Sequence, residues 1–328
     1  MKCINRWLCV LLSLCLMVLT ACSGQKLEYP YAEASKLSSY TIFDSMVGSR
    51  SDTFADTLVV TKDNIREELD SVLEENGTFS CGLLIDMKQK DMLYAHNIHQ
   101  RMHPASLTKL MTALVALENG SLDMQLTATN NTVVDVSGTQ VYGLKTGDTL
   151  TLEQALNVLL IYSANDVALL IAEGVGGNVA HFVELMNQKA KELGATNTHF
   201  NNPHGLTEEE HYTTAYDLYL MFQEAIKQDK IVEIIQKDIY TTTYTDKNNK
   251  VKDLSVTSTN RYLSGKAKAP DSVNIIGGKT GSTKAAGSCL MLYVKDKEGK
   301  AYIAEILNSE SNDSLYLQMT SLLETIEK

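Results

Sequence analysis

The sequence predicts an α+β protein in which the two ends of the globular region form one antiparallel sheet and the middle is mostly helical. Strand-like apolar runs occur near those ends, at 79–87 and 91–95 and again at 288–294 and 301–307. The helical segments between them are not separated by strands. This order argues against a doubly wound parallel sheet, and we expect the terminal hairpins to pair beside the helices.

The first residues predict export. Lys2 and Arg6 precede an apolar run over 7–20 that is too short to span a bilayer and has the length of a signal-peptide core. The run ends in small residues before Cys22, which resembles the lipobox of bacterial lipoproteins. We therefore expect a signal peptide over 1–21 and a lipid on Cys22 that anchors the chain to the outer face of the membrane. An ordinary cleaved signal peptide is the alternative.

Composition limits the partners and the cysteine chemistry. The formal net charge is −11 and the acidic residues are dispersed. Phosphate binding needs clustered basic side chains, so we expect no nucleic acid as a partner. Of the six cysteines, three lie in the signal peptide and Cys22 is the expected lipid site. Cys81 and Cys289 remain in apolar runs, and we interpret them as buried free thiols.

The other segments follow in chain order. Residues 22–77 predict a tether and a short amphipathic helix capped by Asp63, and 78–328 predict one globular catalytic domain. Inside it, Thr151 and Gln154 form a capping box that opens an apolar helix. Further helices are expected at 179–193, 214–227 and 314–326.

The first chemical motif lies in HPASLTKLMTALVALENG, residues 103–120, a helix that is apolar nearly all round and carries one lysine. A buried ammonium needs a partner or loses its proton. Lys109 has Ser106 three residues before it on the same helical face. Alone this pattern is weak, because the lysine could reach solvent from the helix start and because 23–26 shows the same spacing.

The second motif interrupts an apolar helix. The chain breaks after Tyr162 into Ser163, an alanine and Asn165, and a second apolar helical segment follows. Ser-x-Asn also occurs at 258–260 and 272–274, but only Ser163 separates two apolar helices. Buried hydroxyl and amide groups need partners, which the first motif and a substrate could supply.

The third motif is Lys-Thr-Gly, which occurs at 145–147 and 279–281. The first copy leads into the capping box, and we interpret it as a turn. The second follows an extended segment with glycines, which let a backbone approach a ligand closely. Lys279 and Thr280 offer a cation and a hydroxyl suited to a carboxylate. We therefore interpret the second copy as the functional one.

The three motifs in this order form the set found in β-lactamases and penicillin-binding proteins. The chain resembles the low-molecular-mass penicillin-binding proteins that are serine D-alanyl-D-alanine carboxypeptidases of the peptidase S11 type. PASLTKLMTA, YSANDVALLIAE, FNNPHGL, HYTTAYDL, TNRYL and GGKTGSTKAAGSC share the resemblance, which extends over roughly 80–308. It implies a β-lactamase/transpeptidase-like fold.

The resemblance assigns three catalytic roles. Ser106 is the expected acylated nucleophile, and Lys109 is the base that activates it, because a free serine hydroxyl is a weak nucleophile. Desolvation on an apolar helix should lower the pKa of the lysine, so that a neutral amine can accept the proton. Ser163 can relay that proton to the departing D-alanine.

The resemblance also implies a set of substrate-binding groups. Asn165 would hold the catalytic lysine and the substrate peptide, and the backbone N–H groups of Ser106 and Ser282 would form the oxyanion hole. The terminal carboxylate would be gripped by the Lys-Thr-Gly motif, namely Lys279, Thr280 and Gly281. No cofactor or metal is expected.

The substrate implied is a peptidoglycan pentapeptide ending in D-Ala-D-Ala, with β-lactams as covalent inhibitors. Only 282–328 follows the third motif. We therefore expect the further β-rich domain and the C-terminal amphipathic helix of many family members to be absent, with the lipid on Cys22 as the anchor.

Two other functions stay open. A class A-like β-lactamase needs a deacylating glutamate in Glu-x-x-Leu-Asn, and Glu153 matches these letters but precedes Ser163, in the wrong order. A non-catalytic peptidoglycan-binding lipoprotein is the second alternative. His99 and His103 lack the glutamate of H-E-x-x-H, and His211 is interpreted as a structural hydrogen bonder at a helix start.

One departure from the family concerns carboxylate recognition. Related enzymes commonly carry an arginine on or after the strand that follows Lys-Thr-Gly, whereas no arginine occurs here after Arg261. Ser282 replaces the aromatic or histidine residue often found next to that motif. Arg261 and Tyr262 are interpreted as packing and surface residues. We expect weak recognition of small D-Ala-D-Ala peptides and strong dependence on Lys279.

Overall fold

The structure is a computed structural model that describes residues 65–134 and 138–327. The expected signal peptide over 1–21, the expected lipid site Cys22 and the predicted cap Asp63 lie outside the described residues. No single described helix is long and apolar enough to cross a membrane, and one pair of helices bent by 87° passes on length and composition alone.

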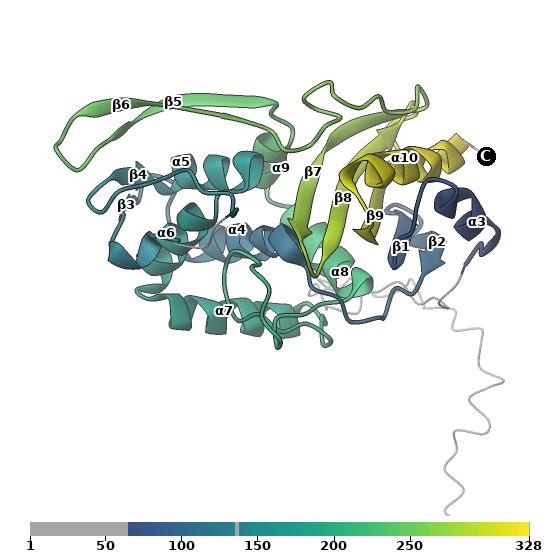
Figure 1. Cartoon of the computed structure of the whole chain (residues 1–328), viewed down its shortest axis with the longest axis horizontal. Coiled ribbons are helices and arrows are strands. Elements are labelled where there is room, and N and C mark those ends of the chain that lie inside the picture. The colour runs from purple at the N-terminus through teal and green to yellow at the C-terminus, as the bar shows by residue number, and fades with distance from the viewer. Residues whose placement is uncertain (1–64, 135–137, 328) are drawn as a thin grey trace, which may run out of the picture. The chain divides into compact units, whose positions relative to one another are not determined.

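The ends of the described chain form a five-stranded antiparallel sheet with the strand order β2-β1-β9-β8-β7 (Figure 1). Strand β1, from the N-terminal hairpin, pairs with β9, from the C-terminal hairpin, so the sheet closes the chain on itself. The predicted α+β class, with a sheet built from both ends, is confirmed. The strands are β1 (Cys81–Asp86), β2 (Asp91–His96), β7 (Val273–Thr283), β8 (Gly287–Asp296) and β9 (Ala301–Ser309).

Alternate residues of the sheet face two separate cores. In β9, Tyr302 and Ile306 pack in a core with helices α3 and α10, while Ile303 and Leu307 pack in the larger core of the helical segment. Buried Cys81 and Cys289 are free thiols, as expected. The helices of the first core are α3 (Glu68–Glu74) and α10 (Asn312–Leu323), and the short turn η5 (Glu324–Glu327) follows.

The middle of the chain is helical, as predicted. The capping box is present at the start of α5, since the Thr151 hydroxyl accepts from the Gln154 N–H and the Gln154 side chain accepts from the Thr151 N–H. Helix α4 is buried on nearly every face. The elements are η2 (Ala105–Leu107), α4 (Thr108–Asn119), η3 (Asn130–Thr132), α5 (Leu152–Asn157), the π-helical turn η4 (Val158–Tyr162), α6 (Asn165–Gly176), α7 (Val179–Glu192), α8 (Ala215–Ala225) and α9 (Asp229–Ile235).

A second antiparallel sheet, with the strand order β3-β4-β5-β6, was not predicted. Its long hairpin, β5 and β6, lies along the helical segment in Figure 1. The segment after β6 brings Thr259 and Arg261 to the cleft described below. The strands are β3 (Gln125–Thr127), β4 (Thr149–Thr151), β5 (Ile239–Thr245) and β6 (Val251–Thr257).

Candidate active site

Ser106 lies where the 3-10 turn η2 passes into α4, with its side chain partly accessible. Ala105 before it has a φ of +47°, a conformation that costs a non-glycine residue roughly 1–2 kcal/mol. Gly205 permits it, because a Cβ at Gly205 would lie 1.8 Å from the Ala105 carbonyl oxygen. The loop around Gly205 therefore packs directly on the backbone that presents Ser106.

Lys109 is fully buried, at 0% exposure, one helical turn beyond Ser106. Its Nζ donates to Ser106 Oγ at 2.9 Å, to Asn165 Oδ1 at 2.6 Å and to the His204 carbonyl oxygen at 2.6 Å. Burial lowers its pKa well below the ordinary lysine value, the charge of Lys279 lowers it further, and Asp166 opposes the shift. A neutral amine at this place can accept the Ser106 proton.

Ser163 follows the π-helical turn η4 and adopts a left-handed conformation with φ +70°. This turn ends one apolar helix and lets Asn165 begin the next, α6, so both polar side chains reach the same place. Lys279 on β7 is 1% exposed, and its Nζ donates to Ser163 Oγ and to the Thr280 carbonyl oxygen, both at 2.8 Å. Burial lowers the pKa of Lys279 to about 7. The site thus holds two serine–lysine pairs.

Strand β7 lies against η2 at the third motif. A Cβ at Gly281 would lie 3.1 Å from the Ser106 backbone nitrogen, so glycine keeps that N–H open to a ligand. Ser282 beside it is exposed. The Thr280 and Thr259 hydroxyls are 2.6 Å apart, which links β7 to the segment after β6.

Asp166 holds the loop around 138–144, part of which lines the cleft. Its carboxylate accepts the backbone N–H groups of Tyr142, Gly143 and Leu144 at 2.9, 2.7 and 3.1 Å, and the Asn165 N–H donates to the Gln140 carbonyl at 2.8 Å. The residues just before this clamp, Gly138 to Gln140, line the cleft.

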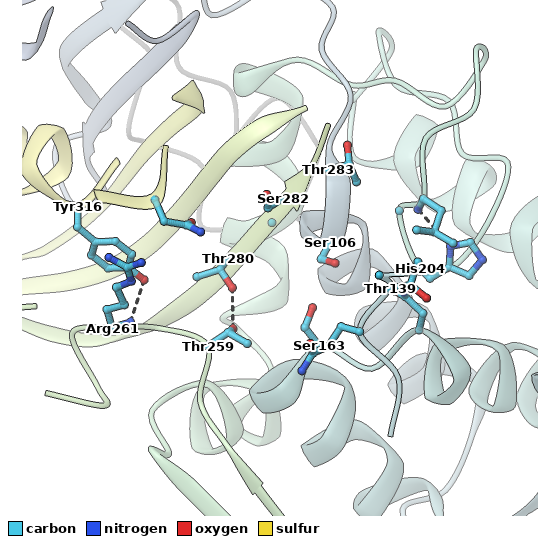
Figure 2. Close-up of a pocket in the computed structure, with 17 residues that line it drawn as sticks. Ser106, Thr139, Ser163, His204, Thr259, Arg261, Thr280, Ser282, Thr283 and Tyr316 are labelled. Atoms are coloured by element: carbon cyan, nitrogen blue, oxygen red, sulfur yellow. Dashed lines mark hydrogen bonds between the residues drawn. The ribbon is translucent and has the colours of Figure 1, made fainter. Parts of the chain in front are cut away.

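Ser106, Ser163 and Asn165 line one cleft of about 480 Å³, together with Thr280, Gly281 and Ser282. In Figure 2, Ser106, Ser163 and Ser282 occupy its centre, Arg261 and Tyr316 lie at one end, and Thr283 and His204 lie on the other side. Arg261 is ion-paired with Asp313 and lies 5.4 Å from the Tyr316 ring centroid. The sequence interpretation of Arg261 as a packing and surface residue missed its place in the cleft.

The sequence agrees with this geometry. The model of the peptidase S11 family, D-alanyl-D-alanine carboxypeptidase, matches residues 77–311. The chain belongs to this family. The S11 relatives include DacF of Bacillus subtilis, 35% identical over 248 residues and 74% of this chain, and DacD of Escherichia coli, 29% identical over 241 residues and 70% of this chain. The chain spans 60% of the length of DacF and 58% of that of DacD.

Solved structures share the fold of this chain. A variant of the Streptomyces K15 DD-transpeptidase superposes with a TM-score of 0.69 at 27% identity, over 75% of this chain and 97% of that one. A D-alanyl-D-alanine carboxypeptidase of Mycobacterium tuberculosis gives 0.66 at 25% identity, over 76% and 90%. The expected β-lactamase/transpeptidase fold is therefore confirmed.

The remaining sequence candidates lie elsewhere in this S11 domain. The Lys-Thr-Gly copy at 145–147 forms a turn, as expected. Glu153 pairs with Lys230 at 2.8 Å and is not among the residues that line the cleft. In the described part of the chain, no cluster of three or more histidine, cysteine or acidic residues could hold a metal.

His211 supports the backbone beside Ser106. Its Nδ1 accepts the Asn201 N–H at 3.1 Å, so Nε2 carries the proton and donates to Thr108 Oγ1 at 2.9 Å. Thr108 in turn donates to the Ala105 carbonyl at 2.8 Å. Burial lowers the pKa of His211 to about 3, which keeps the ring neutral. The geometry agrees with the structural role expected from the sequence.

Proposed function

We propose that the protein is a serine-type D-alanyl-D-alanine carboxypeptidase that removes the terminal D-Ala from peptidoglycan stem peptides through an acyl-enzyme on Ser106. The observation that carries the proposal is the contact between the fully buried Lys109 Nζ and the accessible Ser106 Oγ, 2.9 Å apart. A buried base beside an accessible hydroxyl is the arrangement that nucleophilic catalysis requires. Membership of the S11 family supports the same reaction.

Acylation uses Lys109 and then Ser163 to move the proton. Neutral Lys109 takes the Ser106 proton as Oγ attacks the carbonyl carbon of the penultimate D-Ala, and the backbone N–H groups of Ser106 and Ser282 receive the oxyanion. Ser163 relays that proton to the leaving amine of the terminal D-Ala. Water then attacks the ester, which releases the shortened peptide and restores Ser106.

The substrate carboxylate binds at the end of the cleft that contains Thr280. The Thr280 and Ser282 hydroxyls border the cleft, and Arg261 is the cation that lines it. Lys279 contributes its charge from behind Ser163. Arg261 thereby takes the place of the arginine that the chain lacks after Lys-Thr-Gly, since a guanidinium binds a carboxylate through two parallel hydrogen bonds.

The family supports action on cell-wall peptidoglycan outside the cytoplasm. We extend this to covalent inhibition by β-lactams, which acylate the same serine, and to anchoring through a lipid on Cys22. For the anchor, replacing Cys22 by serine should move the protein from the detergent phase to the aqueous phase. Wild-type protein that is already aqueous after processing contradicts it.

The function is tested by mass spectrometry of a pentapeptide ending in D-Ala-D-Ala, together with labelling by a fluorescent penicillin. Wild-type protein should release one alanine and become labelled, and Ser106→Ala should do neither. Ser121→Ala, at an exposed position, is the matched control and should behave as wild type. Labelling without alanine release favours a β-lactamase-like or non-catalytic role, and residual labelling of Ser106→Ala contradicts the nucleophile.

A further inference from the structure

A second cavity of about 320 Å³ lies beside the catalytic cleft and carries charges of both signs. The cleft and this cavity are lined by consecutive parts of the same segments. Leu206 and Thr283 line the cleft, whereas Glu209 and Ala285, a few residues further on, line the second cavity. Its lining also includes Arg101, His103, Glu210 and Tyr212.

A hydroxyl contact joins the two segments between the residues that line the cleft and those that line the second cavity. Thr207 Oγ1 and Thr283 Oγ1 are 3.0 Å apart, and these residues precede Glu209 and Ala285 on their segments. Figure 2 shows Thr283 and Arg261 at opposite ends of the cleft, with Ser106 between them. A ligand that extends past Thr283 is directed toward the residues that line the second cavity.

The orientation of the substrate decides which of its parts comes to this cavity. Under the proposed function, the leaving D-Ala lies at the end of the cleft with Thr280 and Arg261, and the scissile carbonyl lies between Ser106 and Ser282. The acyl part of the peptide must then extend the opposite way, past Thr283. The residue before D-Ala-D-Ala is the first whose side chain can reach the second cavity.

The charged side chains around the cavity do not form ion pairs with each other. The Arg101 guanidinium lies 4.3 Å from the Tyr212 ring centroid, which is a cation–π contact. Within the described residues, no ion pair joins Arg101 to Glu209 or Glu210, and neither glutamate side chain has an ion-pair partner. A guanidinium and two carboxylates that border one cavity without pairing are suited to a ligand that carries both charges.

We infer that the second cavity binds an amino-acid head, an ammonium plus a carboxylate, at the end of the side chain that precedes D-Ala-D-Ala. Arg101 takes the carboxylate, and Glu209 and Glu210 take the ammonium. The inference rests on the proposed function, because that function sets the direction of the peptide. These side chains are exposed, so each ion pair should change kcat/KM by only about two- to fivefold.

The test uses three pentapeptides that differ only in the residue before D-Ala-D-Ala, which is diaminopimelate, lysine or norleucine. Wild-type kcat/KM should fall in that order. Arg101→Ala should lower kcat/KM for the diaminopimelate peptide to the value for the lysine peptide. It should leave kcat/KM for the other two peptides unchanged. The double variant Glu209→Gln and Glu210→Gln should lower kcat/KM for the diaminopimelate and lysine peptides toward the value for the norleucine peptide. Arg66→Ala and Glu298→Gln, outside both cavities, are the matched controls and should change nothing.

Each other outcome overturns the inference. Equal kcat/KM for the three peptides, or an equal loss on all three in Arg101→Ala, shows that the cavity does not select the side chain. The norleucine peptide and penicillin labelling report on the proposed function separately. If penicillin labels Ser106 but no peptide loses alanine, the proposed function fails and the inference fails with it.

Discussion

Two buried sites in this protein hold ionisable side chains at nearly zero exposure. They differ in whether those side chains have hydrogen-bond partners. In the cleft, Lys109 and Lys279 are 0% and 1% exposed, and each ammonium nitrogen contacts a serine hydroxyl and a backbone carbonyl. In the sheet, Glu305 on β9 is 0% exposed, and neither of its oxygens has a hydrogen-bond partner among the described residues.

The difference shows what burial accomplishes in each place. Burial lowers the pKa of both lysines and raises the pKa of Glu305 well above its ordinary value. All three are therefore driven toward the neutral form. Only the lysines contact serine hydroxyls, Ser106 for Lys109 and Ser163 for Lys279, so under the proposed function neutrality there supplies a base. At Glu305 the desolvated carboxyl has no hydrogen-bond partner among the described residues, and we expect its burial to lower stability.

The largest expected effect is on the rate of Ser106 acylation, which should depend on Lys109 and not on Glu305. Lys109→Met should lower the rate of Ser106 acylation by about 10²–10⁴-fold, the usual contribution of general acid–base catalysis. The melting temperature of this variant should stay close to that of wild type, because removing a desolvated amine offsets the loss of its hydrogen bonds to Asn165 and His204. Glu305→Leu is the matched replacement at the other site and should acylate at the wild-type rate. Acylation of Lys109→Met within tenfold of wild type contradicts the role of the base.

A smaller effect on kcat/KM distinguishes the accessible Arg261 from the buried Lys279. Arg261→Ala should lower kcat/KM for a free-acid peptide by roughly tenfold to a hundredfold, since a hydrogen bond to a charged group contributes about 1.5–3 kcal/mol. It should have little effect on the same peptide with an amidated terminus. Asp313→Asn, which removes only the ion-pair partner, is the control and should not lower the rate.

The comparison with Lys279 completes this test. Lys279→Ala should lower the rates on acid and amide peptides alike, if its main role is to act through Ser163. A loss confined to the free acid assigns carboxylate recognition to Lys279, as the sequence predicts, and removes it from Arg261.

The third effect concerns stability. Glu305→Leu should raise the free energy of unfolding at pH 4 by about 1–3 kcal/mol, the cost of an unpaired buried polar group. Glu305→Gln keeps the unpaired polar atoms and should gain little. Denaturant unfolding measures both variants. Destabilisation by Glu305→Leu shows that the carboxyl has a partner that the geometry does not reveal.

The smallest effect is the pH slope at the same residue. Because the folded pKa of Glu305 is raised, the folded state keeps a proton above pH 4.5 that the unfolded state releases. Stability should therefore fall as pH rises, by at most about 1.4 kcal/mol per unit. Glu305→Leu should lose this slope, so its advantage over wild type widens with pH. Parallel pH curves for the two proteins contradict a raised pKa.

Local patterns were sufficient for much of the fold. The capping box of Thr151 and Gln154 and the two terminal hairpins depend on neighbouring residues, and the structure has them. The hairpin β5–β6 was missed, although Asn248 and Asn249 lie between the Thr- and Tyr-rich run of β5 and the strand-like run of β6. Asn249 has a φ of +59°, which is typical of such a turn.

The site was predictable only in part. Ser106 and Lys109 are neighbours on one helix, so their contact follows from spacing. The contact between Lys279 and Ser163 joins residues 116 positions apart, and no local pattern indicates it. Arg261 reaches the cleft because β5 and β6 carry the segment after them there. The stretch TNRYL, which shares the family resemblance, was the available signal.

The most direct test of the account is the pH dependence of Ser106 acylation by a fluorescent penicillin. If burial and the nearby charge of Lys279 make Lys109 a neutral base, the acylation rate should rise with pH through an apparent pKa well below the ordinary lysine value of about 10.4. Lys279→Met should move that apparent pKa upward, because it removes the neighbouring positive charge. A wild-type rate that stays flat to pH 9 and rises only near 10.4 contradicts the claim that burial converts this lysine into the catalytic base.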